Sequence, residues 1–325
     1  MTRSALLPNN FTIAMVTTVA VASLLPCRNG AAFAFNIITN IAIAALFFLH
    51  GAKLSREAVV SGATHWRLHL LVLLSTFAAF PLLALLLKPA IVPFVGENLY
   101  IGILFLCILP STVQSSIAFV SIARGNVSAA VSSASASSLI GIFITPVLAG
   151  MLVIHQKGEA ATSWQSIGDI LLQLLVPFVV GQLSRKWVSG WLNRNQGMLK
   201  FVDQGSILLV VYTAFSEAVN EGLWQTIPLH ALLGVVLTSG ILLAIALLST
   251  QLIARRLGFN KEDEITIMFC GSKKSLASGI PMAKVLFPVN VIGSIVLPLM
   301  IFHQIQLMVC AMLAQKYAKR PSPAP

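Results

Sequence analysis

Long apolar stretches recur along the whole chain, and only short polar segments separate them. Each stretch is close to the roughly 20 residues that a helix needs to cross about 30 Å of hydrocarbon. The stretches lack the alternation of polar and apolar positions that is typical of strands in a membrane barrel. The pattern therefore predicts an all-α polytopic membrane protein. We expect ten transmembrane spans, at about residues 10–27, 31–50, 67–87, 99–120, 127–154, 167–184, 204–220, 231–254, 263–286 and 293–315.

The composition agrees with a membrane protein, because 57% of the residues are hydrophobic and only 10% are charged. The formal net charge of +11 raises the question of a nucleic-acid partner. With a cytoplasmic N-terminus, however, most Lys and Arg residues gather on one side, as expected of short cytoplasmic loops. That side carries Arg3, Lys53, Arg56, Arg67, Arg124, Arg185, Lys186, Arg194, Lys200, Arg255, Arg256, Lys261, Lys316, Lys319 and Arg320. The opposite side carries Arg28, Lys88, Lys157 and Lys284. We predict an integral protein of the cytoplasmic (inner) membrane, with both termini cytoplasmic, anionic lipid as a contact and no nucleic-acid partner.

The ten expected spans divide into two halves of five that resemble each other. A shift of 160 residues carries the sixth, eighth, ninth and tenth spans onto the first, third, fourth and fifth. It also places Ser115 on Ser275 and Arg124 on Lys284. Because each half has an odd number of spans, the halves would have opposite orientations in the membrane. Inverted repeats are typical of transporters that hold substrate near the bilayer midplane. We expect a first repeat at 1–155, a second at 164–316 and a cytoplasmic tail at 317–325.

The fourth and ninth spans also contain residues that interrupt helices. "CILPSTVQSSIAFVSIARGN" places Pro110 before hydroxyl and amide side chains, and "FCGSKKSLAS" places Gly271 before two lysines. Unwound backbone at membrane depth is tolerated only inside protein or along a cavity. Two half-helices would then direct their N-terminal dipoles at one point, which suits an anion. The alternative is a simple kink at Pro110, with serines bonded to preceding carbonyls. The expected substrate- or ion-binding residues are Ser111, Thr112, Gln114, Ser115, Ser116, Ser272, Lys273, Lys274 and Ser275.

Two adjacent lysines, Lys273 and Lys274, lie near the middle of the ninth span. A cation at this depth costs about 2.5 kcal/mol or more, so such residues usually face the interior of a helix bundle. The alternative, in which the side chains extend to the membrane surface, is weakened by their depth. Adjacent residues on a helix are about 100° apart, so the two lysines should have different surroundings. We expect Lys273 to face a central cavity and Lys274 to reach a helix terminus or a substrate carboxylate.

"PSTVQSSIAF", "ARGN" and "FCGSKKSLASGIPMAK" resemble the SBF-like (YfeH-type) branch of the bile acid:sodium symporter superfamily, and the similarity covers almost the whole chain. The resemblance implies ten helices in two inverted repeats. It implies a panel domain of spans 1, 2, 6 and 7 and a core domain of spans 3–5 and 8–10. It also implies that the broken spans 4 and 9 cross in the core. Transport of an organic anion would proceed by movement of the core against the panel.

The chain departs from the sodium-coupled members of that superfamily at their ion ligands. Those members resemble one another in a glutamate, a following glycine and a Gln-Asn pair on the ninth span. Aligned on Gly271, this chain has Phe269 for the glutamate and the two lysines for the Gln-Asn pair. We expect no sodium at these sites, no other metal and no cofactor. Our hypothesis is that a lysine ammonium takes the role of the sodium ion, with transport of a small organic anion that is either proton-coupled or uncoupled.

Other polar residues within the spans are secondary candidates. Asn36 and Asn40 form an i, i+4 pair that either faces the cavity or joins two helices. His303 and Gln304 lie near the middle of the tenth span, where the histidine is either a proton relay or bonded within the core. Glu217 is either a counter-ion or an interfacial charge.

Motifs of soluble enzymes are absent from the sequence, which has no zinc-like Cys/His spacing, P-loop or GxSxG stretch. We therefore predict a transporter and no enzyme. Two alternatives stay open. One is an intramembrane hydrolase in which Ser272 or Ser275 pairs with a lysine. The other is a non-transporting membrane regulator of ion or envelope homeostasis.

Overall fold

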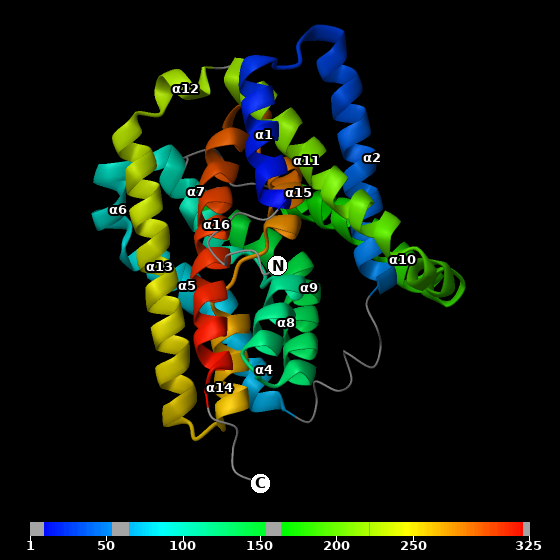
Figure 1. Ribbon diagram of the computed structural model, residues 1–325. Helices are drawn as coiled ribbons and strands as arrows, with labels where there is room; N and C mark the ends of the chain where they lie inside the picture. Colours follow the sequence, from blue (N-terminus) through cyan, green and yellow to red (C-terminus); the bar gives the residue numbers. More distant parts are fainter. Residues whose placement is uncertain (1–9, 54–64, 154–163, 221, 321–325) are drawn as a thin grey trace.

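The computed structural model describes residues 10–53, 65–153, 164–220 and 222–320, and every regular element in these residues is helical (Figure 1). The first half contains α1 (Asn10–Leu24), α2 (Asn29–Lys53), α4 (Trp66–Leu74), η2 (Ser75–Ala79), α5 (Phe80–Leu86), α6 (Lys88–Val95), α7 (Glu97–Ile108), α8 (Val113–Ile122), α9 (Val127–Leu148) and η3 (Ala149–Val153). The second half contains α10 (Trp164–Arg194), α11 (Gln196–Asn220), α12 (Leu223–Thr226), α13 (Leu229–Arg256), α14 (Lys261–Gly271), α15 (Leu276–Leu286) and α16 (Val289–Ala318). The expected all-α fold is confirmed.

Six helical stretches within the described residues are long and apolar enough to cross a membrane. They are Asn29–Lys53, Trp66–Leu86, Val127–Val153, Gln196–Asn220, Leu229–Arg256 and Val291–Ala318. The bent pair α7 and α8 would add a seventh. The other expected spans coincide with helices as well, namely α1, α10 and the pair α14 and α15. The ten-span inverted repeat itself stays a prediction.

Two helix pairs are interrupted where the sequence predicts unwinding. Residues 109–112 separate α7 from α8, and these helices are bent by 65°. Pro110 lies in this first break and has no N–H to donate to a preceding carbonyl. Residues 272–275 separate α14 from α15, directly after Gly271. The backbone groups released at both breaks must find partners within the protein, because hydrocarbon offers none.

The helices pack in two groups, which Figure 1 shows to the right and to the left of the molecule. On the right, α2 packs along α10, and α1 packs along α11. On the left and below, α16 packs against α7 and α13, while α14 packs against α13 and α4. Contacts of α11 with α16 and of α10 with α15 join the groups. The interrupted helices therefore belong to the group around α16.

The contact between α2 and α10 depends on two glycines. A Cβ atom added at Gly51 would collide with the carbonyl oxygen of Phe178, and one added at Gly181 would collide with that of Phe48. The two backbones therefore touch directly, as is common between helices in membranes.

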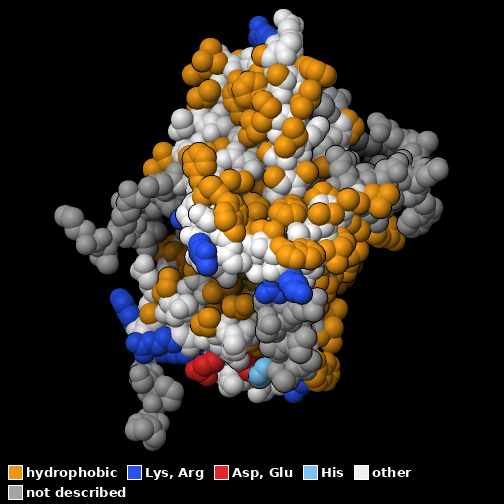
Figure 2. Space-filling model, turned by 90° about the vertical axis from the view of Figure 1, so that its right-hand side faces the viewer, with side chains coloured by type: hydrophobic (Ala, Val, Ile, Leu, Met, Phe, Trp, Pro, Cys, Tyr) orange, Lys and Arg blue, Asp and Glu red, His pale blue; other side chains and the backbone are white. Residues whose placement is uncertain are grey.

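The surface is largely apolar. Figure 2 shows hydrophobic side chains over most of one face, with most of the visible charged side chains in its lower half. Large exposed apolar residues occur on several helices and include Phe33, Leu86, Trp187, Phe201 and Leu229. Such a surface would aggregate in water and is suited to lipid.

Candidate functional site

The two helix breaks contact each other directly. The backbone N–H of Ser275 donates to the carbonyl oxygen of Pro110 at 2.8 Å. In return, the Ser111 hydroxyl donates to the carbonyl oxygen of Cys270 at 2.6 Å. Each break thus donates a hydrogen bond to a backbone carbonyl of the other break that has lost its partner within the helix.

A face of small residues on α9 supports the first break. Ser137, Gly141 and Thr145 are spaced by four residues and therefore lie on one side of the helix. The backbone N–H of Ser111 donates to the Ser137 hydroxyl at 3.0 Å. Thr145 donates to the carbonyl oxygen of Ile108 at 2.9 Å. Gly141 lies against the ring of Pro110, so a larger side chain would not fit.

The Lys274 ammonium binds three backbone carbonyl oxygens. Its Nζ atom donates to Cys107 at 2.5 Å, to Thr76 at 2.7 Å and to Leu109 at 2.9 Å. The first and third of these carbonyls belong to the C-terminal end of α7, where the helix dipole is negative. The ring of Phe80 lies below the same ammonium, with its centroid 4.4 Å from Nζ. A fully buried cation therefore occupies a cage of carbonyl oxygens at the crossing of the breaks.

The Lys273 ammonium has different surroundings, although it is also fully buried. Its Nζ atom donates to the carbonyl oxygen of Ser115 in α8 at 2.8 Å. It lies 3.9 Å from the ring centroid of Phe119 and 5.4 Å from that of Phe269. Aromatic faces attract cations, so these rings replace part of the lost hydration. Within the described residues, neither Lys273 nor Lys274 forms an ion pair with a carboxylate.

Gln306 of α16 binds the unwound backbone of Lys274. Its side-chain oxygen accepts the N–H of Lys274 at 3.0 Å, and its side-chain nitrogen donates to the Lys274 carbonyl oxygen at 2.9 Å. The same nitrogen lies 2.8 Å from Nδ1 of His303. On the other side, Ser75 donates to the carbonyl oxygen of Gly271 at 2.9 Å. The second break is therefore held by side chains from two different helices.

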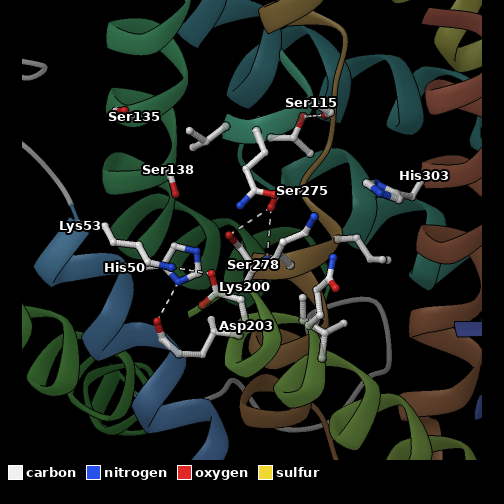
Figure 3. A pocket seen from close by; sticks show the side chains of 18 of the residues that line it. His50, Lys53, Ser115, Ser135, Ser138, Lys200, Asp203, Ser275, Ser278 and His303 are labelled. Atoms are coloured by element: carbon white, nitrogen blue, oxygen red, sulfur yellow. Dashed lines mark hydrogen bonds and ion pairs between the residues drawn. The ribbon is translucent and has the colours of Figure 1, made fainter. Parts of the chain in front are cut away.

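A cavity of about 350 Å³ lies beside the crossing (Figure 3). One side of it is formed by the first turns of α8 and α15, with Thr112, Ser115, Ser275 and Ser278. The other side comes from α2 and α11, and Figure 3 shows His50, Lys53 and Asp203 together there. Its further polar lining residues are Gln114, Ser135, Ser138, Lys200, Gln204 and His303. Because Lys53 and Lys200 are exposed, we infer that the cavity reaches the surface at their end.

A buried ion pair lies at the other end of α2 and α11. The Lys284 ammonium is 2.8 Å from Oε2 of Glu217, and Asn36 donates to Oε1 of the same carboxylate at 2.7 Å. These residues join α15, α11 and α2. Glu217 lies fourteen residues after Asp203, which corresponds to about 21 Å along a helix. An ion pair thus joins the helices at one end of this group, and the cavity lies toward the other end.

A model of the SBF-like CPA transporter family matches residues 9–319. The chain belongs to this family. The putative symporter YfeH of Escherichia coli K12 is 57% identical over 314 residues, which cover 95% of this chain and 93% of YfeH. An uncharacterised protein of Pseudomonas aeruginosa is 61% identical over 320 residues, or 98% of this chain and 96% of the relative. The sodium/bile acid cotransporter 7 of Rattus norvegicus is 29% identical over 310 residues, covering 93% and 90% of the two chains.

Membership of the SBF-like CPA transporter family confirms the resemblance seen in the sequence, and with the apolar helices it identifies an integral membrane protein. The relatives YfeH and cotransporter 7 are named as a putative symporter and a sodium/bile acid cotransporter, and not as enzymes. This finding agrees with the prediction that the chain is no enzyme and leaves the Ser/Lys hydrolase without support.

Some of the residues that the sequence singles out in this SBF-like protein line the cavity, and others do not. Those that line it are Thr112, Gln114, Ser115, Ser275 and His303. Those that do not are Ser111, Ser116, Ser272, Lys273, Lys274, Asn36, Asn40 and Gln304. We expected Lys273 to face the cavity, but its ammonium is enclosed by Phe119, Phe269 and the backbone of α8. Asn40 is exposed on α2, and Gln304 is half-buried on α16.

The cavity residues of α2 and α11 were missed by the sequence analysis. Lys53 and Lys200 are counted there only among the charges of the cytoplasmic side, and His50 and Asp203 are not among the candidate residues. A signal was present, because Leu46, His50 and Lys53 have the i, i+4, i+7 spacing of one helix face. Gln306 and Thr76 were also missed as partners of Lys274. For Thr76 no signal exists, because its backbone carbonyl is the contact.

Proposed function

We propose that this protein is a secondary active transporter of a small organic anion and that a buried lysine replaces the sodium ions of its sodium-coupled relatives. The observation that carries the proposal is the Lys274 ammonium within three carbonyl oxygens at the crossing of two broken helices. Carbonyl oxygens at unwound helices are the ligands that transporters use for sodium. An internal ammonium with the same partners makes a bound metal cation unnecessary there.

An organic anion fits the side of the cavity formed by α8 and α15. Both helices begin at the cavity, so their positive dipole ends are directed toward it. The hydroxyl groups of Thr112, Ser115, Ser275 and Ser278 add hydrogen-bonding partners. Lys53 and Lys200 bring positive charge from the other side. The substrate-binding role of the serines remains our proposal, which the cavity supports.

Transport would proceed by alternating access, with movement of a core domain against a panel domain. The panel comprises spans 1, 2, 6 and 7, and the core comprises spans 3–5 and 8–10 of two inverted repeats. The open end near Lys53 and Lys200 and the closed end at Lys284 and Glu217 fit one state of such a cycle. Under the proposed topology, in an inner membrane with cytoplasmic termini, the open end faces the cytoplasm.

The test is flux through purified protein in liposomes. A panel of radiolabelled small organic acids, with taurocholate included, is offered with and without sodium and with and without a pH gradient. We expect uptake of at least one acid without sodium, and a loss of more than about tenfold in the separate Lys273→Met and Lys274→Met variants, equivalent to 1.4 kcal/mol in the transport barrier. Unchanged flux in both variants would remove the lysine mechanism. If no acid moves under any condition, the regulator is favoured instead.

A further inference from the structure

Two histidine side chains line the cavity, His50 from α2 and His303 from α16. In the view of Figure 3 they lie on opposite sides of Ser275. A neutral imidazole carries a proton on only one of its two nitrogens, and the hydrogen bonds of the ring decide which one. The partners of these two rings therefore show what each histidine offers to the cavity.

The ring of His303 is held as a hydrogen-bond donor. Its Nδ1 atom lies 2.8 Å from the side-chain nitrogen of Gln306. The orientation of this amide is fixed, because its oxygen accepts the N–H of Lys274 and its nitrogen donates to the Lys274 carbonyl oxygen. An amide nitrogen can only donate, so Nδ1 of His303 accepts and Nε2 carries the proton. A second proton on this ring would have to displace the bond with Gln306.

The ring of His50 has the opposite arrangement. Its Nδ1 atom lies 2.8 Å from the carbonyl oxygen of Leu46. A carbonyl oxygen can only accept, so Nδ1 carries the proton and Nε2 keeps its lone pair. Nε2 makes no hydrogen bond within the described residues and is accessible rather than enclosed, and the space that the His50 side chain borders is the cavity. His50 can therefore take up a proton without breaking a hydrogen bond.

The charges around His50 favour a proton there when an anion is bound. The charge of the Asp203 carboxylate is largely balanced by the Lys53 ammonium at 2.6 Å. An anion in the cavity adds a negative charge near the imidazole, so proton and anion each strengthen the binding of the other. The remaining ionisable cavity residues are Lys200 on α11 and His303 on α16, whereas α1, α8, α9, α10 and α15 line the cavity only with uncharged residues.

We propose that transport is coupled to protons and that His50 is the residue that binds the proton, while His303 stays neutral as a hydrogen-bond donor. This inference rests on the proposed transport of a small organic anion and names its coupling ion. A proton from water at the open end binds to Nε2 of His50 when the anion enters, and it leaves with the anion on the other side. A monovalent anion that enters together with a proton adds no net charge to the cavity, which lowers the cost of moving it through hydrocarbon.

The first test examines the two rings in the unmodified full-length protein. Diethyl pyrocarbonate attacks the lone pair of a neutral imidazole nitrogen, and mass spectrometry of the peptides reports each histidine separately. We expect His50 to react at least about tenfold faster than His303, whose only lone pair is occupied by Gln306. The rate at His50 should fall between about pH 8 and about pH 5, because the added proton then occupies Nε2.

The second test measures coupling in liposomes with radiolabelled lactate, succinate and taurocholate, and protein-free liposomes give the background. In the wild type, an inward proton gradient should accelerate the uptake of at least one acid about threefold or more. His50→Gln keeps a polar side chain that binds no proton, so the gradient should have no effect above the background. His230→Gln is the matched control, because His230 is exposed and does not line this cavity, and it should respond to the gradient as the wild type does.

The outcomes separate this inference from the proposal beneath it. If no acid moves in the wild type, the transport function fails and the inference fails with it. If acids move but the proton gradient has no effect, or if its effect survives in His50→Gln, only the inference is overturned. Equal modification of His50 and His303 would also overturn it. If His50→Gln does not fold, the modification rates in the wild type decide the question.

Discussion

The Lys284 ammonium and the Glu217 carboxylate form an ion pair at 2.8 Å, and their side chains are only 6% and 11% exposed. Lys284 lies near the C-terminal end of α15, and the N-terminal end of the same short helix borders the cavity at Ser275. A rigid element of eleven residues thus connects the ion pair with the proposed substrate site. Breaking the pair should free this helix from α11 and α2.

The first prediction is that Glu217→Gln opens the closed end. The pair loses its charge attraction and leaves a buried ammonium poorly compensated, so the closed state becomes less favourable. A cysteine at Ser278 reports this, because the four native cysteines are buried. A membrane-impermeant maleimide added from the Lys284 side should label the variant at least about threefold faster than the parent. Glu97→Gln, which disrupts the exposed pair with Lys88, is the control and should not change the rate. Equal labelling rates in all three proteins would contradict the idea that the pair of Lys284 and Glu217 keeps this end closed.

The second prediction concerns the unequal structural roles of the two buried lysines. Lys274→Met leaves three carbonyl oxygens at helix breaks and in η2 without their donor, which should cost about 3 kcal/mol or more. Lys273→Met removes a cation that is held by one hydrogen bond and two rings, and Ser115 remains inside α8. Its cost should stay below about 1 kcal/mol, because loss of the contacts is offset by loss of a buried charge. The thermal unfolding midpoints of the wild type and the two variants in the same detergent show which variant loses more stability. A larger loss of stability in Lys273→Met than in Lys274→Met would show that the carbonyl cage around Lys274 does not stabilise the contact between the two helix breaks.

The third prediction is that sodium does not stabilise the protein. A ligand that binds only the folded state raises the unfolding midpoint by mass action. Because the ammonium of Lys274 occupies the carbonyl cage, the midpoints in sodium and potassium chloride should agree within about 1 °C at equal ionic strength. Choline chloride serves as a further control. A rise seen only with sodium, and saturating with concentration, would mean that sodium binds elsewhere in the protein.

The fourth prediction tests the contact between α2 and α10. Gly181→Ala places a methyl group against the carbonyl oxygen of Phe48, and the overpacking should cost about 1–3 kcal/mol. Gly190→Ala in the same helix meets no atom within 4 Å and is the matched control. It should raise the stability by about 0.5–1 kcal/mol, because alanine favours helix more than glycine does. Thermal unfolding midpoints of the two variants measure this difference. A lower midpoint for Gly190→Ala than for Gly181→Ala would refute the close backbone contact.

The sequence by itself determined the class of protein and the positions of the helix breaks. Apolar stretches near the length of a span, together with Pro110 and Gly271 inside two of them, are local signals that act through nearby residues. The burial of Lys273 and Lys274 could also be anticipated, because a charge at that depth has few stable places. The resemblance to the sodium-coupled members, aligned on Gly271, also predicts that their sodium ligands are missing, because Phe269 stands in place of the glutamate.

Only the tertiary structure decided what each charged side chain meets. Lys274 binds the carbonyls of Thr76, Cys107 and Leu109, and backbone carbonyls leave no mark in a sequence because every residue has one. Asp203 and Lys53 are 150 residues apart, and Glu217 and Lys284 are 67 apart, so chain folding alone brings each pair together. Whether such a charge faces lipid headgroups, a partner or a cavity depends on helix packing, which local patterns do not encode.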